Sequence, residues 1–248
     1  MKLSVLMAAY NEETTLAECV QHVLDLQLSN IELELILVVS PSTDKTQIIA
    51  QQFANHPSVT LVLEEHALGK GFAIRTGLKL ATGEIVLIQD ADLEYSVDDY
   101  LKLITPIMQQ KTQFVLGSRH NGLFKMRDMA NQPLMSLYTN FGHLVLKKLF
   151  NLMYQTAIAD PFTMYKVFNR ALIQNVEFVS NRFDFDIELL AKLVRLGHIP
   201  IEIPITYKSR GYKEGKKIGI LRDPPTWIYA MLRFRFTALG SNMDFPHE

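Results

Sequence analysis

The chain has 248 residues, of which 48% are apolar and 21% are charged, which is ordinary usage for a globular protein. This composition excludes a wholly disordered, collagen-like or coiled-coil chain. Its 25 basic and 26 acidic residues give a formal net charge of −1, so the overall charge predicts neither nucleic-acid binding nor strong adsorption to a membrane. The length fits one large domain with a full core better than two small ones.

The single cysteine, Cys19, excludes an internal disulfide and fits a reducing compartment, so we expect a cytoplasmic location. The sequence around Cys19 offers no obvious base partner for a thiol, so we expect a core residue rather than a nucleophile. The first apolar run is too short for a secretory signal and predicts a buried strand. Residues 129–146 are the best candidate for a membrane span, but Pro133 and several amides and hydroxyls argue against one. Peripheral contact with a membrane is compatible with this sequence.

In the first half of the chain, short apolar runs alternate with helical patterns. Strands are expected at residues 3–8, 33–39, 59–63 and 84–89, and helices at residues 13–26, 45–53 and 71–82. The continuous apolar run in the fourth strand suggests cover on both faces. The alternation therefore predicts an α/β fold with a Rossmann-like, mostly parallel sheet, helices on both faces and ligand-binding loops along the carboxyl edge.

The second half is less regular. Helices are expected at residues 98–109, 134–154, 183–196 and 226–236, strands at 114–117 and 199–207, and a loop at 121–131. A basic segment, residues 208–217, follows the last strand. Because no repeat or linker interrupts the chain, we expect a single domain over residues 1–236 and a flexible tail over 237–248.

An acidic motif follows the fourth expected strand. Asp90 and Asp92 stand two residues apart, so in extended geometry their carboxylates point the same way, and Glu94 continues the series. Hard oxygen ligands at the end of a strand suit Mg²⁺ or Mn²⁺, with water or ligand phosphates in the remaining positions. An acidic turn that caps the next helix is the alternative. The position directly after a buried strand favours the metal site.

Further motifs follow the other expected strands. In chain order they are Ala9-Tyr10-Asn11-Glu12-Glu13, Ser42-Thr43-Asp44-Lys45-Thr46, Gly69-Lys70-Gly71 with Arg75-Thr76-Gly77, Asp90-Ala91-Asp92-Leu93-Glu94-Tyr95, Gly117-Ser118-Arg119, and Asp160 with Tyr165-Lys166. In this order and spacing the chain resembles glycosyltransferases of family 2, which have the GT-A fold, and especially the dolichyl- and polyprenyl-phosphate glycosyltransferases. The resemblance covers most of the chain, from about residue 3 to residue 236.

The resemblance implies roles on the donor side. Tyr10 and Glu12 match positions that line the nucleotide pocket. Asp90 and Asp92 match the Asp-x-Asp that holds a metal on the donor pyrophosphate, and Glu94 matches a third ligand position. A metal there offsets the charge that develops on the nucleoside diphosphate as it leaves.

Lys70 and Arg75 would also lie near the donor by resemblance. A glycine-assisted loop that enters a helix explains the segment around Lys70 equally well. The spacing of its glycines fits neither a Walker loop nor a dinucleotide fingerprint.

On the acceptor side, the resemblance implies that Arg119, Arg127 and Arg210 face an acceptor phosphate, since arginine forms bidentate contacts with phosphate. Asp160 matches a carboxylate that acts as a base or positions the acceptor, and a turn or helix cap before proline is the alternative.

His120 and His143 lack the spacing of metal ligands, so we expect ordinary surface or helix residues.

One departure from the family pattern concerns the donor. The family usually has Asp-Asp-Gly-Ser after its second strand, where this chain has Val39-Ser40-Pro41-Ser42. The missing carboxylates normally help to hold the base and ribose. We therefore expect altered donor specificity with weaker base discrimination, and a weakened donor site is the alternative.

The expected helix over residues 134–154 has apolar residues over a broad arc, and two interpretations fit it. It is either buried against the sheet or an interfacial helix that guides a lipid acceptor, with Lys147 and Lys148 toward anionic headgroups.

Taken together, these motifs and the resemblance imply a metal-dependent, inverting glycosyltransferase. It would move a hexose from a nucleotide-diphosphate sugar to a phosphorylated acceptor, with polyprenyl phosphate as one candidate. A nucleotidyltransferase would need a glycine-rich, arginine-containing loop after the first strand, where residues 9–12 differ. A degenerate sugar-nucleotide-binding or scaffold protein is the alternative that Val39-Ser40 motivates.

Overall fold

The computed structural model describes residues 1–119, 133–210, 223–237 and 239. These residues form a seven-stranded sheet in the order β3-β2-β1-β4-β6-β5-β7. The strands are β1 (Lys2–Ala9), β2 (Glu32–Val39), β3 (Val59–Leu63), β4 (Ile85–Asp90), β5 (Phe114–Ser118), β6 (Lys166–Asn169) and β7 (Ile201–Pro204). Neighbouring strands are parallel except for β6, which runs antiparallel to β4 and β5. The predicted mostly parallel sheet is confirmed.

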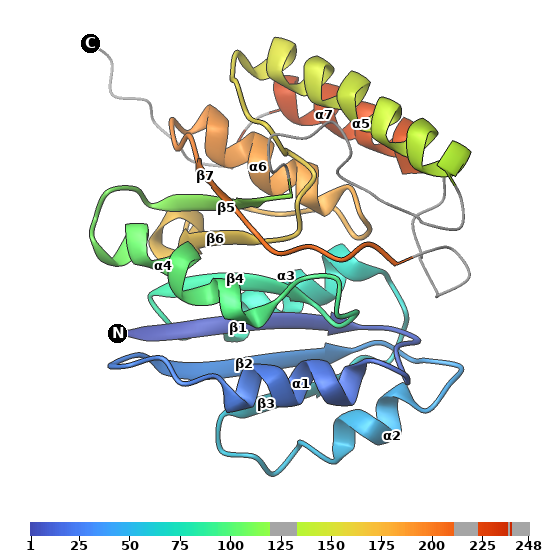
Figure 1. Ribbon diagram of the computed structural model, residues 1–248, viewed down its shortest axis with the longest axis vertical. Coiled ribbons are helices and arrows are strands. Elements are labelled where there is room, and N and C mark those ends of the chain that lie inside the picture. Colours follow the sequence, from blue (N-terminus) through green and yellow to red (C-terminus); the bar gives the residue numbers. More distant parts are fainter. Residues whose placement is uncertain (120–132, 211–222, 238, 240–248) are drawn as a thin grey trace.

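Helices cover both faces of this sheet, as predicted (Figure 1). They are α1 (Leu16–Asp25), α2 (Thr46–Gln51), α3 (Lys70–Leu80), α4 (Tyr100–Met108), α5 (Pro133–Tyr154), α6 (Phe185–Arg195) and α7 (Asp223–Phe236), with 3₁₀ turns at Val97–Asp99 and Arg170–Ile173. Helices α1, α2 and α4 pack on one face, and α3 and α6 pack on the other. Helices α5 and α7 lie side by side against α6, farther from the sheet.

Strand β4 illustrates why both faces need cover. Successive side chains of a strand point to opposite faces. Ile85 and Leu87 therefore join the core under α1 and α4, while Val86 and Ile88 join the core under α3 and α6, and all four are at most 2% exposed. The continuous apolar run predicted this arrangement correctly.

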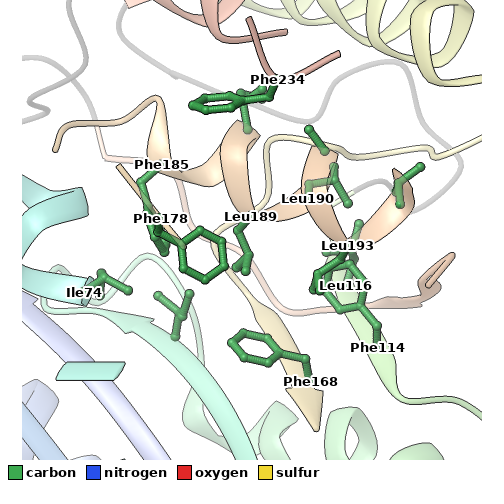
Figure 2. Packing of buried hydrophobic residues seen from close by; sticks show 14 of the residues in the cluster. Ile74, Phe114, Leu116, Phe168, Phe178, Phe185, Leu189, Leu190, Leu193 and Phe234 are labelled. Atoms are coloured by element: carbon green, nitrogen blue, oxygen red, sulfur yellow. The ribbon is translucent and has the colours of Figure 1, made fainter. Parts of the chain in front are cut away.

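Helix α6 is the most deeply buried helix segment near the site, because it lies between the sheet and α7. Figure 2 shows Leu189, Leu190 and Leu193 of α6 packed near Phe168 of the sheet and Phe234 of α7. Burying one leucine side chain contributes roughly 1.5–3 kcal/mol. This packing fixes the amino end of α6, which faces the candidate site described below.

The expected elements are found within a few residues of their predicted bounds, and one strand was missed. Strand β6 has only four residues, too few for a period to stand out in the sequence. Several expectations lie outside the described residues. They are the loop at 121–131, the basic segment from residue 211 on, nearly all of the tail, His120 and Arg127. In the part of the chain that the structure describes, no helix combines the length and apolarity needed to cross a bilayer.

Candidate active site

A pocket of about 530 Å³ opens at the carboxyl ends of β1, β2 and β4. The strand order reverses direction between β1 and β4, since β2 and β3 continue on one side and β4 begins the other. Ligands of open α/β sheets bind at this kind of switch point. Residues from the amino end of α6 and from α7 complete the wall, among them Phe183, Asp186 and Trp227.

The loops after β1 and β2 are joined by side-chain hydrogen bonds. The backbone N–H of Glu12 donates to Thr46 Oγ1 at 2.7 Å, and the N–H of Thr43 donates to Asn11 Oδ1 at 2.8 Å. Asn11 itself adopts a positive φ of 50°, which asparagine tolerates better than most residues. These bonds between the loops after β1 and β2 fix the turn that brings Tyr10 and Glu12 to the pocket.

The acidic motif lies on the pocket wall as predicted: Asp90 ends β4, and Asp92 and Glu94 follow in the next turn. Burial raises the pKa of Asp92 to about 7, and the charges of Asp90 and Glu94 add to this rise. Three carboxylates so close together leave a local excess of negative charge. Such a site favours cations.

Arg210 places a cation against this acidic group from the segment after β7. Its Nη1 donates to Glu12 Oε2 at 3.0 Å, and its Nη2 donates to Asp92 Oδ2 at 2.9 Å. Its backbone N–H donates to Glu94 Oε1 at 2.8 Å. Burial alone would lower the pKa of Arg210, but the hydrogen bonds with Glu12 and the charge of Asp92 raise it. Arg210 thus links three segments that are distant in sequence.

Lys70 reaches the pocket from the start of α3, and its ammonium group donates to Asp90. Burial alone would lower the pKa of Lys70, but the charges of Asp90 and Asp186 raise it. Gly69 precedes it with a φ of +115°, where an added Cβ would lie 2.5 Å from the carbonyl oxygen of Asn181. The glycine-assisted entry into a helix is confirmed, and it also positions Lys70.

Arg75 is not among the residues that line the pocket. Its Nη1 donates to Asn181 Oδ1 at 2.7 Å and to the carbonyl oxygen of Val179 at 3.2 Å. Five residues along a helix turn a side chain well away from the first position, so Lys70 and Arg75 point in different directions. Arg75 joins α3 to the segment before α6.

Arg119 and Asp160 form a buried, bidentate ion pair. Arg119 Nε and Nη2 donate to the two carboxylate oxygens at 2.8 Å each, and the Arg119 backbone N–H adds a third bond at 3.0 Å. The side chains are only 4% and 0% exposed. Burial alone would raise the pKa of Asp160, but the charge of Arg119 holds it well below its usual range. A carboxylate with so low a pKa is a weak base, so the geometry favours Asp160 as the residue that positions Arg119 at the pocket wall.

His143 was expected to be an ordinary surface or helix residue. It lies within helix α5, but it is buried rather than at the surface. It is 5% exposed, and its Nε2 is 3.9 Å from Asp160 Oδ1. The packing of α5 near the Arg119–Asp160 pair explains the burial.

Asp186, a pocket residue in the first turn of α6, was not predicted from the sequence. Among the described residues, its Oδ1 has no hydrogen-bond partner, and burial raises the pKa of its carboxyl group. The nearest cation recorded is Lys166, whose Nζ is 3.7 Å away and whose pKa burial lowers. Asp184 and Asp186, at the start of the helix expected over residues 183–196, were a possible signal of an acidic site. Acidic residues in the first turn are also an ordinary feature of helices.

Glu64 was also missed, and it bears on the departure after β2. Ser40 lines the pocket at the end of β2, and its hydroxyl donates to Glu64 Oε2 at 2.6 Å. Within the described residues, Glu64 Oε1 has no hydrogen-bond partner, and burial raises the pKa of the Glu64 carboxyl group. A carboxylate therefore stands behind the position where the family pattern has its aspartates, and it comes from the segment after β3.

The chemistry of these side chains fits a divalent cation only when other ligands contribute. Asp90 and Asp92 offer hard oxygen atoms at the pocket wall, with negative charge to spare. Across the described residues, no three His, Cys, Asp or Glu side chains are arranged to hold a metal ion together. A cation would therefore need oxygens from water or from ligand phosphates, which is how Mg²⁺ is usually bound.

Curated relatives of the chain act on sugars. The chain is 26% identical over 215 residues to the low-salt glycan biosynthesis hexosyltransferase Agl6 of Haloferax volcanii, which covers 84% of this chain and 48% of that protein. It is 26% identical over 219 residues to a dolichol-phosphate mannosyltransferase of Pyrococcus furiosus, covering 88% and 60%. It is 27% identical over 233 residues to the dolichyl-phosphate β-glucosyltransferase ALG5A of Trichomonas vaginalis, covering 89% and 70%. The chain thus spans about half to two thirds of the length of these relatives.

Among solved structures, glucosyl-3-phosphoglycerate synthase from Mycobacterium tuberculosis, in complex with Mg²⁺ and uridine diphosphate, has the same fold as this chain. The TM-score is 0.67 at 21% identity, with 94% of this chain and 79% of that chain covered. This likeness establishes the predicted GT-A-type fold. The family model described as "Glycosyl transferase family 2" matches residues 4–176, the part of the chain that supplies β1 to β6 and the acidic motif. The chain therefore belongs to glycosyl transferase family 2.

Proposed function

We propose that this protein transfers a hexose from a nucleoside-diphosphate sugar to a phosphorylated acceptor, with inversion and with the help of Mg²⁺ or Mn²⁺. A polyprenyl phosphate is the acceptor that the dolichyl-phosphate relatives favour. The observation that carries the proposal is the meeting of two charged groups in one pocket. Asp90, Asp92 and Glu94 form the acidic side, and Lys70, Arg119 and Arg210 form the cationic side.

The acidic side suits a donor that brings a cation with it. Asp90 and Asp92 would hold the divalent ion against the donor pyrophosphate. When bound, that ion would offset the charge that develops on the departing diphosphate. Tyr10, Glu12 and Ser40 lie next to this position at the ends of β1 and β2, where the nucleoside would be held.

The cationic side suits a phosphate nucleophile. A phosphate monoester has a second pKa near 6 and is largely dianionic at neutral pH, so it needs no general base. It does need cations that hold it close to a donor of the same charge. Arg119 meets this need, since Asp160 holds its guanidinium rigidly at the pocket wall. Arg210 would contribute by releasing part of its contact with Asp92.

The first test is a panel of nucleoside-diphosphate sugars with Mn²⁺ or Mg²⁺, measured by thermal shift and then by transfer to short polyprenyl phosphates. A ligand at 100 times its Kd stabilises a protein by roughly 2.7 kcal/mol, which such a scan detects. We expect stabilisation that requires the metal, and weaker discrimination among bases than in relatives with the aspartate pair. If no sugar nucleotide in the panel stabilises the protein and none is hydrolysed, the proposal is contradicted. Binding without transfer or hydrolysis would instead support the degenerate binding protein.

A hydroxyl acceptor is the second candidate, and one observation favours it. Asp186 lines the pocket, carries a raised pKa and has a carboxylate oxygen without a hydrogen-bond partner among the described residues. Such a group could accept the proton that a hydroxyl loses during attack. This role falls to Asp186 rather than to Asp160, whose two oxygens are engaged by Arg119.

Two variants separate these acceptors. With a phosphate acceptor, Arg210→Ala should lower kcat/KM on the order of 10- to 100-fold, the value of one charge-assisted contact, while Asp186→Asn has a smaller effect. With a hydroxyl acceptor the order reverses, and the loss in Asp186→Asn depends on pH. Circular dichroism on both variants controls for folding.

A further inference from the structure

Helices α5 and α7 carry an unusual share of the exposed apolar surface. Nine of the 19 large hydrophobic side chains that are exposed among the described residues lie on these two helices of 22 and 14 residues. They are Leu137, Tyr138, Phe141, Val145 and Leu152 on α5, and Ile228, Tyr229, Leu232 and Phe236 on α7. Scattered exposed hydrophobics need no explanation, but a concentration of them marks an interaction surface.

On each helix these residues form a stripe rather than a random scatter. Leu137, Phe141 and Val145 are spaced by four residues, and Tyr229, Leu232 and Phe236 by three and four. Residues with this spacing share one face of a helix. The opposite face of α5 joins the core through Leu146 and Phe150 (7% and 0% exposed). Of the two interpretations of this helix, burial therefore holds for one face, and that face packs against α6 and α7 more than against the sheet.

The carboxyl-terminal turns of α5 and α7 are joined by hydrogen bonds. Tyr154 of α5 donates its hydroxyl to the carbonyl oxygen of Met231 at 2.8 Å, and Arg235 of α7 donates to the carbonyl oxygen of Met153 at 2.9 Å. Leu152 and Phe236, the neighbours of Met153 and Arg235, are both 79% exposed, more than any other large hydrophobic in the described residues. The helices lie side by side along the top of Figure 1. The exposed apolar side chains of α5 and α7 are called the α5/α7 face below.

The charged side chains of this helix pair that are not buried are all basic. Helix α5 contains Lys147 and Lys148 and no acidic residue, and α7 contains Arg233 and Arg235 and only one acidic residue, Asp223, which is buried. The chain as a whole has a net charge of −1. Aromatic and aliphatic side chains among basic residues are the combination that binds anionic bilayers.

The α5/α7 face is also connected to the pocket. Trp227 of α7 lines the pocket, and the centroid of its ring lies 5.5 Å from the ring centroid of Phe162, another lining residue. The exposed Ile228 and Tyr229 follow Trp227 directly. A lipid whose phosphate enters the pocket could therefore leave its chain along α7.

We propose that the α5/α7 face docks on an anionic lipid bilayer, with apolar side chains in the interface and the basic side chains at the headgroups. The inference deepens the proposed function, since it selects a lipid-borne acceptor over a water-soluble one. Its test does not depend on transfer.

The experiment is flotation of the full chain with phosphatidylcholine vesicles, with and without a minority of phosphatidylglycerol. Wild type should bind the anionic vesicles more strongly, and salt should weaken this preference. Phe141→Glu and Leu232→Glu should each lower the partition coefficient by about 10-fold or more, since each removes an exposed apolar side chain that would enter the bilayer and adds a negative charge. Lys148→Gln should lower it by about 5-fold, and only on anionic vesicles.

Ile48→Glu is the matched control, because Ile48 is 63% exposed on α2, at the end of the molecule opposite α5 and α7 in Figure 1. It should bind vesicles as wild type does. Absence of flotation, equal loss in Ile48→Glu, or undiminished binding by Phe141→Glu and Leu232→Glu would overturn the inference. A wild-type dimer that Phe141→Glu dissociates, without vesicle binding, would overturn it in favour of a second copy of the chain. Thermal shifts with nucleoside diphosphates on the same samples show separately whether the proposed function stands.

Discussion

Replacing Asp160 by asparagine should destabilise the fold strongly. Asp160 is wholly buried and accepts three hydrogen bonds from Arg119, two on Oδ2 and one on Oδ1. The amide can keep its oxygen at the position of Oδ2, but its nitrogen then faces the N–H of Arg119 Nη2, donor against donor. The guanidinium, 4% exposed, also loses its counter-charge. Breaking a buried pair in this way costs about 3–5 kcal/mol.

Urea denaturation followed by circular dichroism measures this loss, and Asp25→Asn, at an exposed position on α1, is the control. Because the pKa of Asp160 is depressed in the folded state, the pair stabilises the fold above the usual carboxyl range, and this contribution fades only as pH falls through the depressed folded pKa. The deficit of Asp160→Asn should therefore persist at mildly acidic pH and shrink only in strong acid. A deficit below about 1 kcal/mol, the size expected for an exposed pair, would refute the reasoning. So would a deficit that disappears at mildly acidic pH.

Three further outcomes follow from the structure. Asp92→Asn should abolish metal-dependent binding of nucleoside diphosphates while the protein stays folded. Because folding raises the pKa of Asp92 to about 7, wild type without metal should lose stability relative to this variant as pH rises from the usual carboxyl range, about 4, to about 7, and the difference should stay constant above that. Parallel stability profiles of the two proteins between about pH 4 and 7 would contradict this. Gly69→Ala should lower the free energy of unfolding by about 1–3 kcal/mol in a denaturant titration, because its Cβ would press on the Asn181 carbonyl at a φ of +115°. Gly142→Ala within α5 should raise the free energy of unfolding by about 0.5–1 kcal/mol, because there the added Cβ meets nothing within 4 Å. Cys19 is 3% exposed and burial raises its pKa to about 12, so iodoacetamide should modify it at neutral pH only after unfolding, and rapid labelling of the native protein would show that the thiol is accessible.

The sequence alone determined the parts of this protein that depend on local pattern. The alternation of short apolar runs with helical periods predicted the parallel sheet, and the unbroken apolar run of β4 predicted cover on both of its faces. Asp90 and Asp92 at the end of a buried strand could be placed at the carboxyl edge, because parallel strands all end there. Gly69 before a helical pattern likewise predicted the turn into α3.

Only the tertiary structure decided which side chains are partners. Arg210 binds Glu12 across 198 positions, Arg119 binds Asp160 across 41, and Ser40 donates to Glu64 across 24. The same is true of Arg75, which α3 turns away from the pocket, and of Asp186, which the packing of α6 brings to it. Periodicity and turn chemistry act over a few residues, so they fix where an element begins and which of its faces is apolar. The contacts of a polar side chain depend instead on which elements pack beside it, and strands that are adjacent in the sheet, such as β4 and β6, can be distant in the chain.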